Sequence, residues 1–309
     1  MNQIYNCNSD EVRLSILKVL TYFRIFSHPL KLQEIALLCS VSEKIAEQSL
    51  QVLIADEIVY CFDKHFTTCK EVAQLAELRF VKEAEAEKYF AKLKKYARLL
   101  STFPFVRGIA VSGSLSKGVM NPDGDIDYFI ITKPGRLWIC RTSMVLFKKL
   151  FLFNSKKYFC VNYFVDSKNL QIRDENIFTA TEFIHLLPVF EKDGVLADFV
   201  FQNEWVNKFY QRKPDWNKSY MVKGNSRVRS LLEFFLQLSV FNPIERVCHR
   251  LTILFWRKKF STFKKEKFDL TMRSTQGISK HHPSDFQTKV LKEFQEEISK
   301  IHSVTLAEI

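Results

Sequence analysis

The chain has 309 residues, of which 47% are hydrophobic and 26% are charged, and its formal net charge is +12 at pH 7. A chain of this length and composition can bury large hydrophobic cores in two or three domains, which excludes an intrinsically disordered protein. Its most apolar stretches, residues 144–153 and 231–256, are interrupted by charged side chains, so we expect no membrane-spanning helix.

Two further features bear on the compartment and on metal binding. The first ten residues are polar and lack the apolar core of a secretory signal, so we expect a cytoplasmic protein. The seven cysteines are scattered, and none forms the Cys-x-x-Cys pair typical of zinc or redox sites. We therefore expect reduced thiols that take no part in metal chemistry.

Residues 1–70 are predicted to form a winged helix-turn-helix-like module. Three stretches with helical hydrophobic spacing are followed by two short strands: 11–26, 31–39, 43–55, 58–62 and 65–68. A DNA-reading third helix would carry basic or amide side chains, yet this one includes Glu43 and Glu47, which repel phosphates. We therefore favour a scaffold or protein-contact role, with a nucleic-acid-binding regulator kept as an alternative.

Residues 71–200 are predicted to form the second domain, which begins with an uninterrupted charged helix at 71–101 and a strand at 105–111. That strand ends at Gly113 and Ser114. Glycine tolerates positive φ and lets the backbone approach a ligand, and the following hydroxyl and N–H groups can hold phosphate oxygens. Lys117 is then either an additional positive charge for the phosphates or an ordinary surface lysine.

An acidic pair begins the next apolar run, residues 128–131. Because side chains alternate along a strand, Asp125 and Asp127 share one face while Ile126 points into the core. Two adjacent carboxylates are costly without a positive charge, and hard oxygen ligands suit Mg²⁺ or Mn²⁺ together with substrate phosphates. The alternative is an ordinary surface hairpin with a turn at 121–124. It would explain Asp123 and Gly124, but it would not explain two further acids at the start of an apolar strand.

This segment resembles the signature of nucleotidyltransferases of the DNA polymerase beta superfamily, particularly the minimal nucleotidyltransferases. The matching positions are Gly113, Ser114, Gly118, Asp123, Asp125 and Asp127, and Gly124 departs from the serine that the family often has. The resemblance implies transfer of a nucleoside monophosphate from an NTP, such as ATP, to a hydroxyl acceptor. It further implies that Asp125 and Asp127 hold the metal, while Gly113 and Ser114 position the outer phosphates.

The resemblance also implies a third carboxylate on a later strand, where it ligates the metal or activates the acceptor. The candidate strand, residues 158–165, carries Asn162 at its polar position, and an amide cannot accept a proton. Asp166 has the same strand parity and is our candidate third catalytic residue. Asp174 and Glu182 are further possibilities that compete with ordinary surface charges. A catalytically inactive nucleotide-binding or interaction protein therefore stays open.

The fold expected from these elements is α/β (α+β). A helix at 136–153 and a strand at 158–165 would complete a small mixed sheet, and residues 179–190 look helical. The winged-helix-like module would flank this core on one side and a C-terminal helical region on the other.

Residues 201–309 are predicted to be a basic helical region, with 20 Lys or Arg against 11 Asp or Glu. Helices are expected at 227–240, 244–256 and 284–301, with a loop at 274–279. The positive charge has several interpretations that the sequence leaves open: steering of an anionic substrate, RNA contact through stacking and charge, attachment to an anionic membrane surface, or a solvated surface. Nucleic acid is thus a possible partner.

Overall fold

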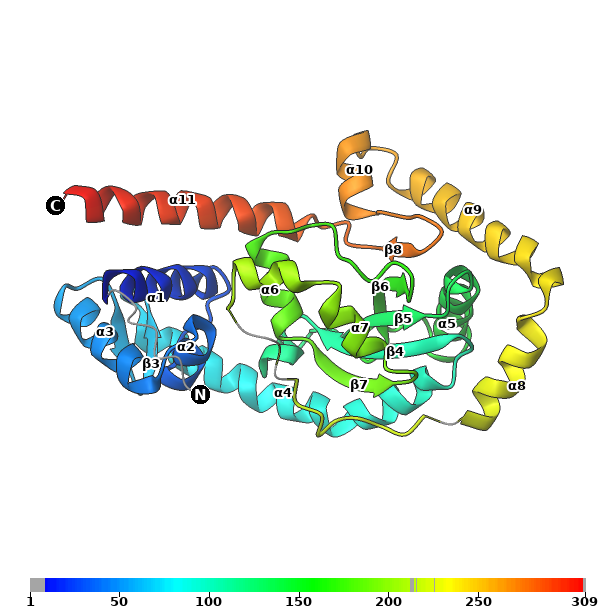
Figure 1. Ribbon diagram of the computed structural model, residues 1–309, viewed down its shortest axis with the longest axis horizontal. Coiled ribbons are helices and arrows are strands. Elements are labelled where there is room, and N and C mark those ends of the chain that lie inside the picture. Colours follow the sequence, from blue (N-terminus) through cyan, green and yellow to red (C-terminus); the bar gives the residue numbers. More distant parts are fainter. Residues whose placement is uncertain (1–8, 212–213, 215, 225, 308–309) are drawn as a thin grey trace. The chain divides into compact units, whose positions relative to one another are not determined.

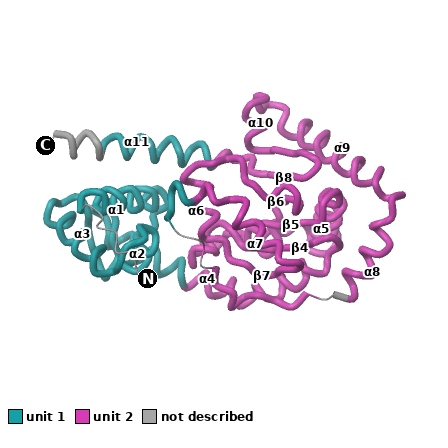
Figure 2. Tube along the Cα trace, viewed as in Figure 1, with its two compact units in different colours: residues 1–83, 207–212, 287–309 teal, residues 84–206, 213–286 magenta. Residues whose placement is uncertain are grey.

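The computed structural model describes residues 9–211, 214, 216–224 and 226–307 (Figure 1). It divides into two compact units, residues 1–83, 207–212 and 287–309 in one and 84–206 and 213–286 in the other (Figure 2). The domain boundaries that we expected at residues 70 and 200 stay predictions. None of the helices in the described ranges is both long and apolar enough to cross a bilayer.

Unit 1 is built from three helices and a small antiparallel sheet with the strand order β1-β3-β2. Its elements are α1 (Ser9–Arg24), β1 (Leu30–Lys31), α2 (Leu32–Cys39), α3 (Glu43–Ala55), β2 (Tyr60–Phe62) and β3 (His65–Thr67). The Ser42 hydroxyl accepts the Ile45 N–H and so caps α3. The elements follow the predicted order, with β1 in addition, and their interpretation as a winged helix stays a prediction.

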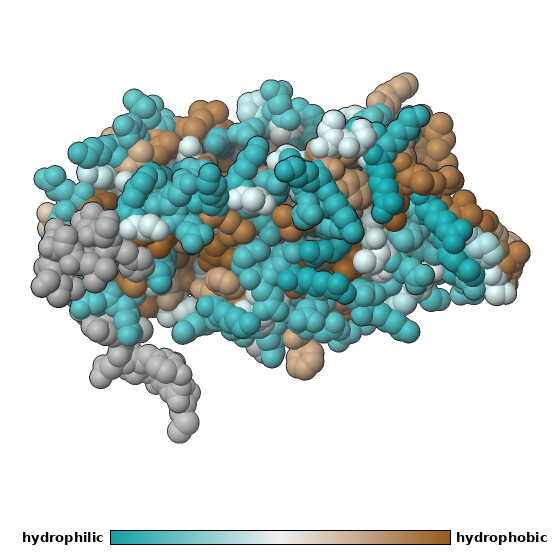
Figure 3. Space-filling model, turned by 90° about the horizontal axis from the view of Figure 1, so that it is seen from above, coloured by the Kyte–Doolittle hydropathy of each residue, from teal (hydrophilic) through white to brown (hydrophobic). Residues whose placement is uncertain are grey.

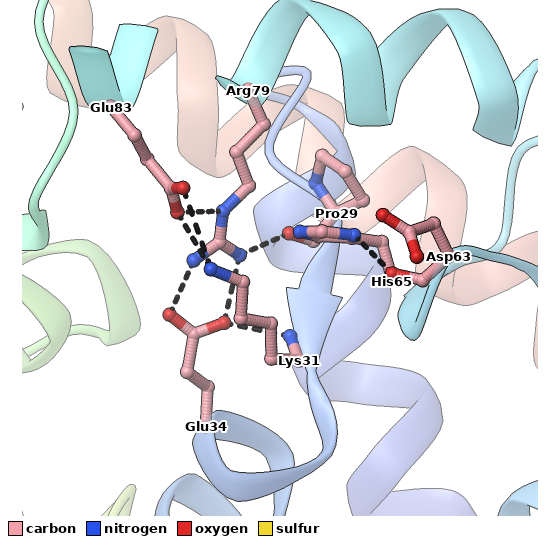
Figure 4. A network of polar contacts seen from close by, with 7 residues as sticks. All are labelled: Pro29, Lys31, Glu34, Asp63, His65, Arg79 and Glu83. Carbon is pink, nitrogen blue, oxygen red and sulfur yellow. Dashed lines mark hydrogen bonds and ion pairs between the residues drawn. The ribbon is translucent and has the colours of Figure 1, made fainter.

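A buried arginine ties the parts of unit 1 together (Figure 4). Arg79, in the first half of α4 (Val72–Ser101), donates to both carboxylate oxygens of Glu34 at 2.7 Å each, and to Glu83 at 2.9 Å. It also donates to the Pro29 carbonyl, and Lys31 reaches Glu83 at 3.0 Å. Because the guanidinium is buried, removing either glutamate would leave it with only one carboxylate partner.

The C-terminal helix also belongs to unit 1. Helix α11 (Phe286–Ala307) brings Phe294 against Tyr22, with ring centroids 5.7 Å apart, and Glu297 to Arg24 at 2.7 Å. Segments from the two ends of the chain therefore share one core.

Unit 2 contains a five-stranded mixed sheet with the order β7-β4-β5-β6-β8. The strands are β4 (Val106–Ser112), β5 (Asp127–Thr132), β6 (Cys160–Asp166), β7 (Leu187–Glu191) and β8 (Ile278–Lys280). Helix α5 (Leu137–Phe151) joins the parallel pair β5 and β6, and the other neighbours are antiparallel. The predicted mixed α/β fold is confirmed.

Helices cover both faces of this sheet, so β5 is hydrophobic on both sides. Tyr128 and Ile130 pack in one core with residues of α4 and α5. Phe129 points the other way, toward Phe199 of α7 (Val195–Phe201), which in turn contacts Phe183 of α6 (Ile177–Ile184). The resulting rigid sheet fixes the backbone on which the acidic pair stands.

Two sequence expectations were wrong in detail. The helix expected at 179–190 ends at Ile184, and β7 follows, because Pro188 cannot continue a helix but is tolerated in an edge strand. The loop expected at 274–279 contains the start of β8. The basic stretch after residue 257 contains a further helix, α10 (Lys265–Thr271).

The rest of the C-terminal part of unit 2 is helical (Figure 1). It comprises α8 (Ser226–Leu236), the short 3₁₀ turn η3 (Ser239–Phe241) and α9 (Asn242–Lys259). A second 3₁₀ turn, η2 (Glu204–Lys208), follows α7. Helix α9 packs against α5.

Candidate active site

The site begins where β4 turns. Gly113 has φ of +72°, a conformation that favours glycine, and a Cβ there would lie 3.0 Å from Oδ2 of Asp127. Ser112 is paired with Asp127 in the β4–β5 register, so the turn and the acidic strand meet directly. Only glycine allows this approach without a shift of the Asp127 carboxylate.

The residues after Gly113 form the short 3₁₀ turn η1 (Leu115–Lys117). The Ser116 hydroxyl and the Lys117 ammonium both donate to the Gly113 carbonyl, at 2.9 and 3.1 Å. Gly118 ends the turn with φ of +74°. Ser114 is exposed at the start of the turn, where the sequence predicted a phosphate-binding hydroxyl.

Helix α4 holds the loop that precedes the acidic pair. The buried Tyr89 hydroxyl bonds the carbonyls of Pro122 and Gly124 at 3.2 and 2.9 Å. A Cβ at residue 124 would collide with the Met120 sulfur, so a larger residue there would require the Met120 side chain to move. Ile126 is fully buried, as predicted.

The folded protein disfavours the charged form of the Asp127 carboxylate. Burial, together with the nearby negative charges of Asp125 and Glu182, raises its pKa to about 6, although the Cys160 thiol and the Asn162 amide oppose this. Asn162 donates to Oδ1 of Asp127 at 2.9 Å. The amide thus occupies the position beside Asp127 where the sequence led us to look for an acid.

Glu182, on α6, is the acidic residue that folding brings to the turn. Its carboxylate accepts the Gly113 N–H at 3.1 Å and the Lys117 ammonium at 2.8 Å. Burial alone would raise the pKa of Glu182, but Lys117 and the Gly113 N–H outweigh it and hold the pKa below its usual value. The Glu182 carboxylate therefore binds the Gly113 N–H and Lys117, the two groups that were predicted from the sequence to bind phosphate.

Asp166, the predicted third catalytic residue, is not brought to this site. It is paired with Thr132 at the far end of the parallel strands, whereas Asp127 is paired with Cys160. Its carboxylate accepts the Lys168 N–H and the Asn169 amide. Asp174 forms ion pairs with Arg273 and Lys280, which account for its charge.

The acidic pair suits a divalent cation. Within the described part of the chain, neither Asp125 nor Asp127 forms an ion pair, and no group of three or more His, Cys, Asp or Glu could hold a metal. The protein thus offers two carboxylates, and the pKa of one of them, Asp127, is raised by burial and then by the nearby negative charges. Mg²⁺ typically takes one or two carboxylates and completes its shell with waters and substrate phosphates, so the donor set fits.

Comparison with known proteins gives one match. Residues 91–233 match the family model described as nucleotidyltransferase domain, a range that contains every predicted site residue. No curated protein and no solved structure matches the chain.

Proposed function

We propose that the protein transfers a nucleoside monophosphate from an NTP to a hydroxyl acceptor, in keeping with the match of residues 91–233 to the nucleotidyltransferase domain family. In this reaction an acceptor oxygen forms a bond to the α-phosphorus, and the bond from that phosphorus to pyrophosphate breaks. One observation carries the proposal: the Asp127 carboxylate lies against the Gly113 turn, the charge of Asp125 acts on it, and among the described residues no ion pair neutralises either aspartate.

The residues of the turn and the acidic strand take different roles. Asp125 and Asp127 would hold Mg²⁺ or Mn²⁺, which would offset the charge that develops on the triphosphate. The Gly113 N–H, Ser114 and Lys117 would bind the outer phosphates, as donors and a point charge do in anion sites. Glu182 already accepts hydrogen bonds from the Gly113 N–H and from Lys117, so these two bonds must break when the nucleotide binds.

The displaced Glu182 carboxylate is our candidate general base. The acceptor hydroxyl must lose a proton, and the Asn162 amide cannot take it. Once Lys117 pairs with phosphate, Glu182 loses the interaction that lowers its pKa and becomes a better proton acceptor. Glu182 takes the place that Asp166 had in the sequence-based hypothesis.

Asn162 supports a second candidate function. Its amide lies against Asp127, where a third carboxylate would otherwise be expected. A protein that binds NTP without transferring it would keep the metal and phosphate contacts but would release no pyrophosphate.

The proposal extends to the nucleotide, the acceptor and the cellular compartment. ATP is a natural candidate among the NTPs, and a cytoplasmic location would supply it. The acceptor is a small molecule, a protein side chain or an RNA end, the last of which the basic C-terminal region would attract.

The test is transfer of label from each NTP, labelled at the α-phosphate, by purified protein with Mg²⁺ or Mn²⁺ and cell extract. We expect one class of acceptor to become labelled, with release of pyrophosphate, and no labelling by protein carrying Asp125→Asn and Asp127→Asn. NTP binding without labelling or pyrophosphate release would favour the inactive alternative.

A further inference from the structure

Helix α8 turns its charged side toward the domain. Arg229 is buried and donates to the Ser101 carbonyl at 3.1 Å. Glu233 accepts the Phe105 N–H at 2.7 Å and pairs with Arg107 at 2.8 Å. Leu236 packs against the core, but most hydrophobic side chains of α8 and of the residues just after it are exposed, Phe234 by 63%: Leu231, Leu232, Phe234, Phe235 and Leu238.

Helix α9 is arranged in the same way. The inward Glu245 accepts the first N–H groups of α5, from Trp138 at 2.7 Å and Ile139 at 2.8 Å, and Trp256 is also buried. The exposed hydrophobic residues recur at helical spacing along one stripe: Ile244, Val247, Leu251, Leu254 and Phe255.

This orientation is the reverse of that in an ordinary helix of a globular protein, whose apolar stripe faces the core. The end of α5 extends the exposed surface, since Lys149 lies 6.0 Å from the Phe255 ring and Phe153 nearby in sequence is 94% exposed. Figure 3 shows hydrophobic side chains gathered toward its right-hand end, the end where α8 and α9 lie, beside hydrophilic ones. Monomeric proteins rarely expose contiguous apolar surface on this scale, and such surfaces usually mark interaction sites.

The charges around this surface are predominantly positive. Residues 226–267 contain ten Lys or Arg against three Asp or Glu. Glu233 and Glu245 are used inward, as described above, which leaves Glu266 as the one acid on the outside. The exposed basic residues flank the apolar stripe of α9: Arg246, Arg250, Arg257, Lys258 and Lys259.

We propose that α8 and α9 form a docking surface for an anionic lipid bilayer, with the apolar stripes in the interface and the basic side chains against lipid phosphates. An exposed apolar stripe flanked by Lys and Arg has the chemistry of helices that lie in a membrane surface. A second copy of the chain would bring the same positive charge against itself. Nucleic acid would leave the aliphatic side chains without a partner.

Co-sedimentation of the full chain with vesicles tests this proposal, which does not depend on nucleotidyl transfer. The two lipid compositions are phosphatidylcholine alone and phosphatidylcholine with phosphatidylglycerol. We expect the protein to sediment with the second and much less with the first. Added salt should weaken the binding, because the charges are exposed.

Two double variants separate the apolar and the charged contributions. Leu251→Ser with Leu254→Ser should weaken vesicle binding at least about tenfold, because two side chains no longer enter the interface. Arg250→Gln with Arg257→Gln should weaken it by about fivefold for each basic residue removed. The control Phe201→Ser, at a 72% exposed position on α7, should bind as the parent does.

The outcomes against the proposal are equally specific. Equal sedimentation with the two kinds of vesicle, or undiminished binding of both double variants, would overturn it. So would a parent protein that is dimeric in solution and becomes monomeric with Leu251→Ser and Leu254→Ser, because a second copy would then cover the surface. Unchanged thermal melting of the variants would show that they fold as the parent does.

Discussion

At the residue scale, the site concentrates negative charge around Asp127 and leaves it uncompensated. The carboxylates of Asp125 and Glu182 both raise the pKa of Asp127 beyond the effect of burial. The turn at Gly113 lies against the same carboxylate, so charge and backbone shape are coupled at one point. Substitutions at these positions should therefore have distinguishable effects on the folding stability of the protein and on its affinity for NTP with Mg²⁺.

Asp127→Asn should stabilise the metal-free protein at neutral pH. The pKa of Asp127 in the folded state is about 6, above its ordinary value of 3.8. The folded state therefore binds the Asp127 proton more tightly than the unfolded state does. The contribution of this proton to the free energy of unfolding is fully present below about pH 4 and is lost as the pH rises through about 6. We expect the variant to exceed the parent by about 2 kcal/mol near pH 7.5 and to match it near pH 4.

Urea unfolding of both proteins in EDTA at the two pH values measures this difference. A variant that is less stable than the parent at both pH values would show that Asp127 is instead compensated in the folded state.

Gly113→Ala and Gly118→Ala form a matched pair. Both glycines have positive φ, so each alanine should cost about 1 kcal/mol of stability or somewhat more. Only at residue 113 does the added Cβ meet Asp127, whereas nothing lies within 4 Å at residue 118. Calorimetry should show that Gly113→Ala alone loses affinity for NTP with Mg²⁺, and equal loss in both variants would contradict the assigned geometry.

Glu182→Gln should lower both KM and kcat, for different reasons. Removing the charge frees Lys117 for phosphate, so KM for the NTP should fall several-fold. Loss of the base should lower kcat by about a hundredfold or more. Steady-state kinetics distinguish this from a raised KM with unchanged kcat, which would make Glu182 a binding residue only. Glu204→Gln, at an exposed position, serves as the control.

The sequence supports specific predictions only for the local part of this site. Gly113, Asp125 and Asp127 are close in the chain, and alternation along a strand constrains where they point. Glu182 was one of two further possibilities, but it is far from Gly113 in sequence, so only the packing of α6 brings the two together. Asp166 failed because parity gives the face of a strand but not its register, which pairs Asp166 with Thr132.

At the element scale, buried glutamate side chains link one element to another by accepting backbone hydrogen bonds. Glu233 of α8 accepts the Phe105 N–H, just before β4, and Glu245 of α9 accepts the first N–H groups of α5. The long helices and central strands were predictable because their patterns are periodic. The three-residue β8 and the edge strand β7 were missed, because short apolar runs do not distinguish strand from helix or loop.

Glu245→Ala should destabilise the protein by about 2 kcal/mol, because it leaves two buried N–H groups at the start of α5 without an acceptor. The midpoint of urea unfolding gives the value. Glu266→Ala, an exposed acid on α10, should change it little, and an equal loss in both variants would contradict the capping role of Glu245.

At the scale of the whole molecule, all residues assigned to nucleotide chemistry lie in unit 2. Unit 1 presents Glu43, Glu47 and Gln51 on the exposed side of α3, which gives phosphates little attraction. A gel-shift experiment at low salt should therefore show no DNA affinity that depends on this helix. Loss of a clear DNA shift on α3 substitution would restore the nucleic-acid-binding regulator as the leading alternative.

The account rests on a metal shared between two carboxylates and a polyphosphate. Isothermal titration of NTP, with Mg²⁺ and then in EDTA, tests it most directly in the parent and in protein carrying Asp125→Asn and Asp127→Asn. We expect affinity that requires Mg²⁺ in the parent and falls at least about tenfold in the double variant. Equal NTP affinity in both proteins, or binding that is indifferent to the cation, would contradict the assignment.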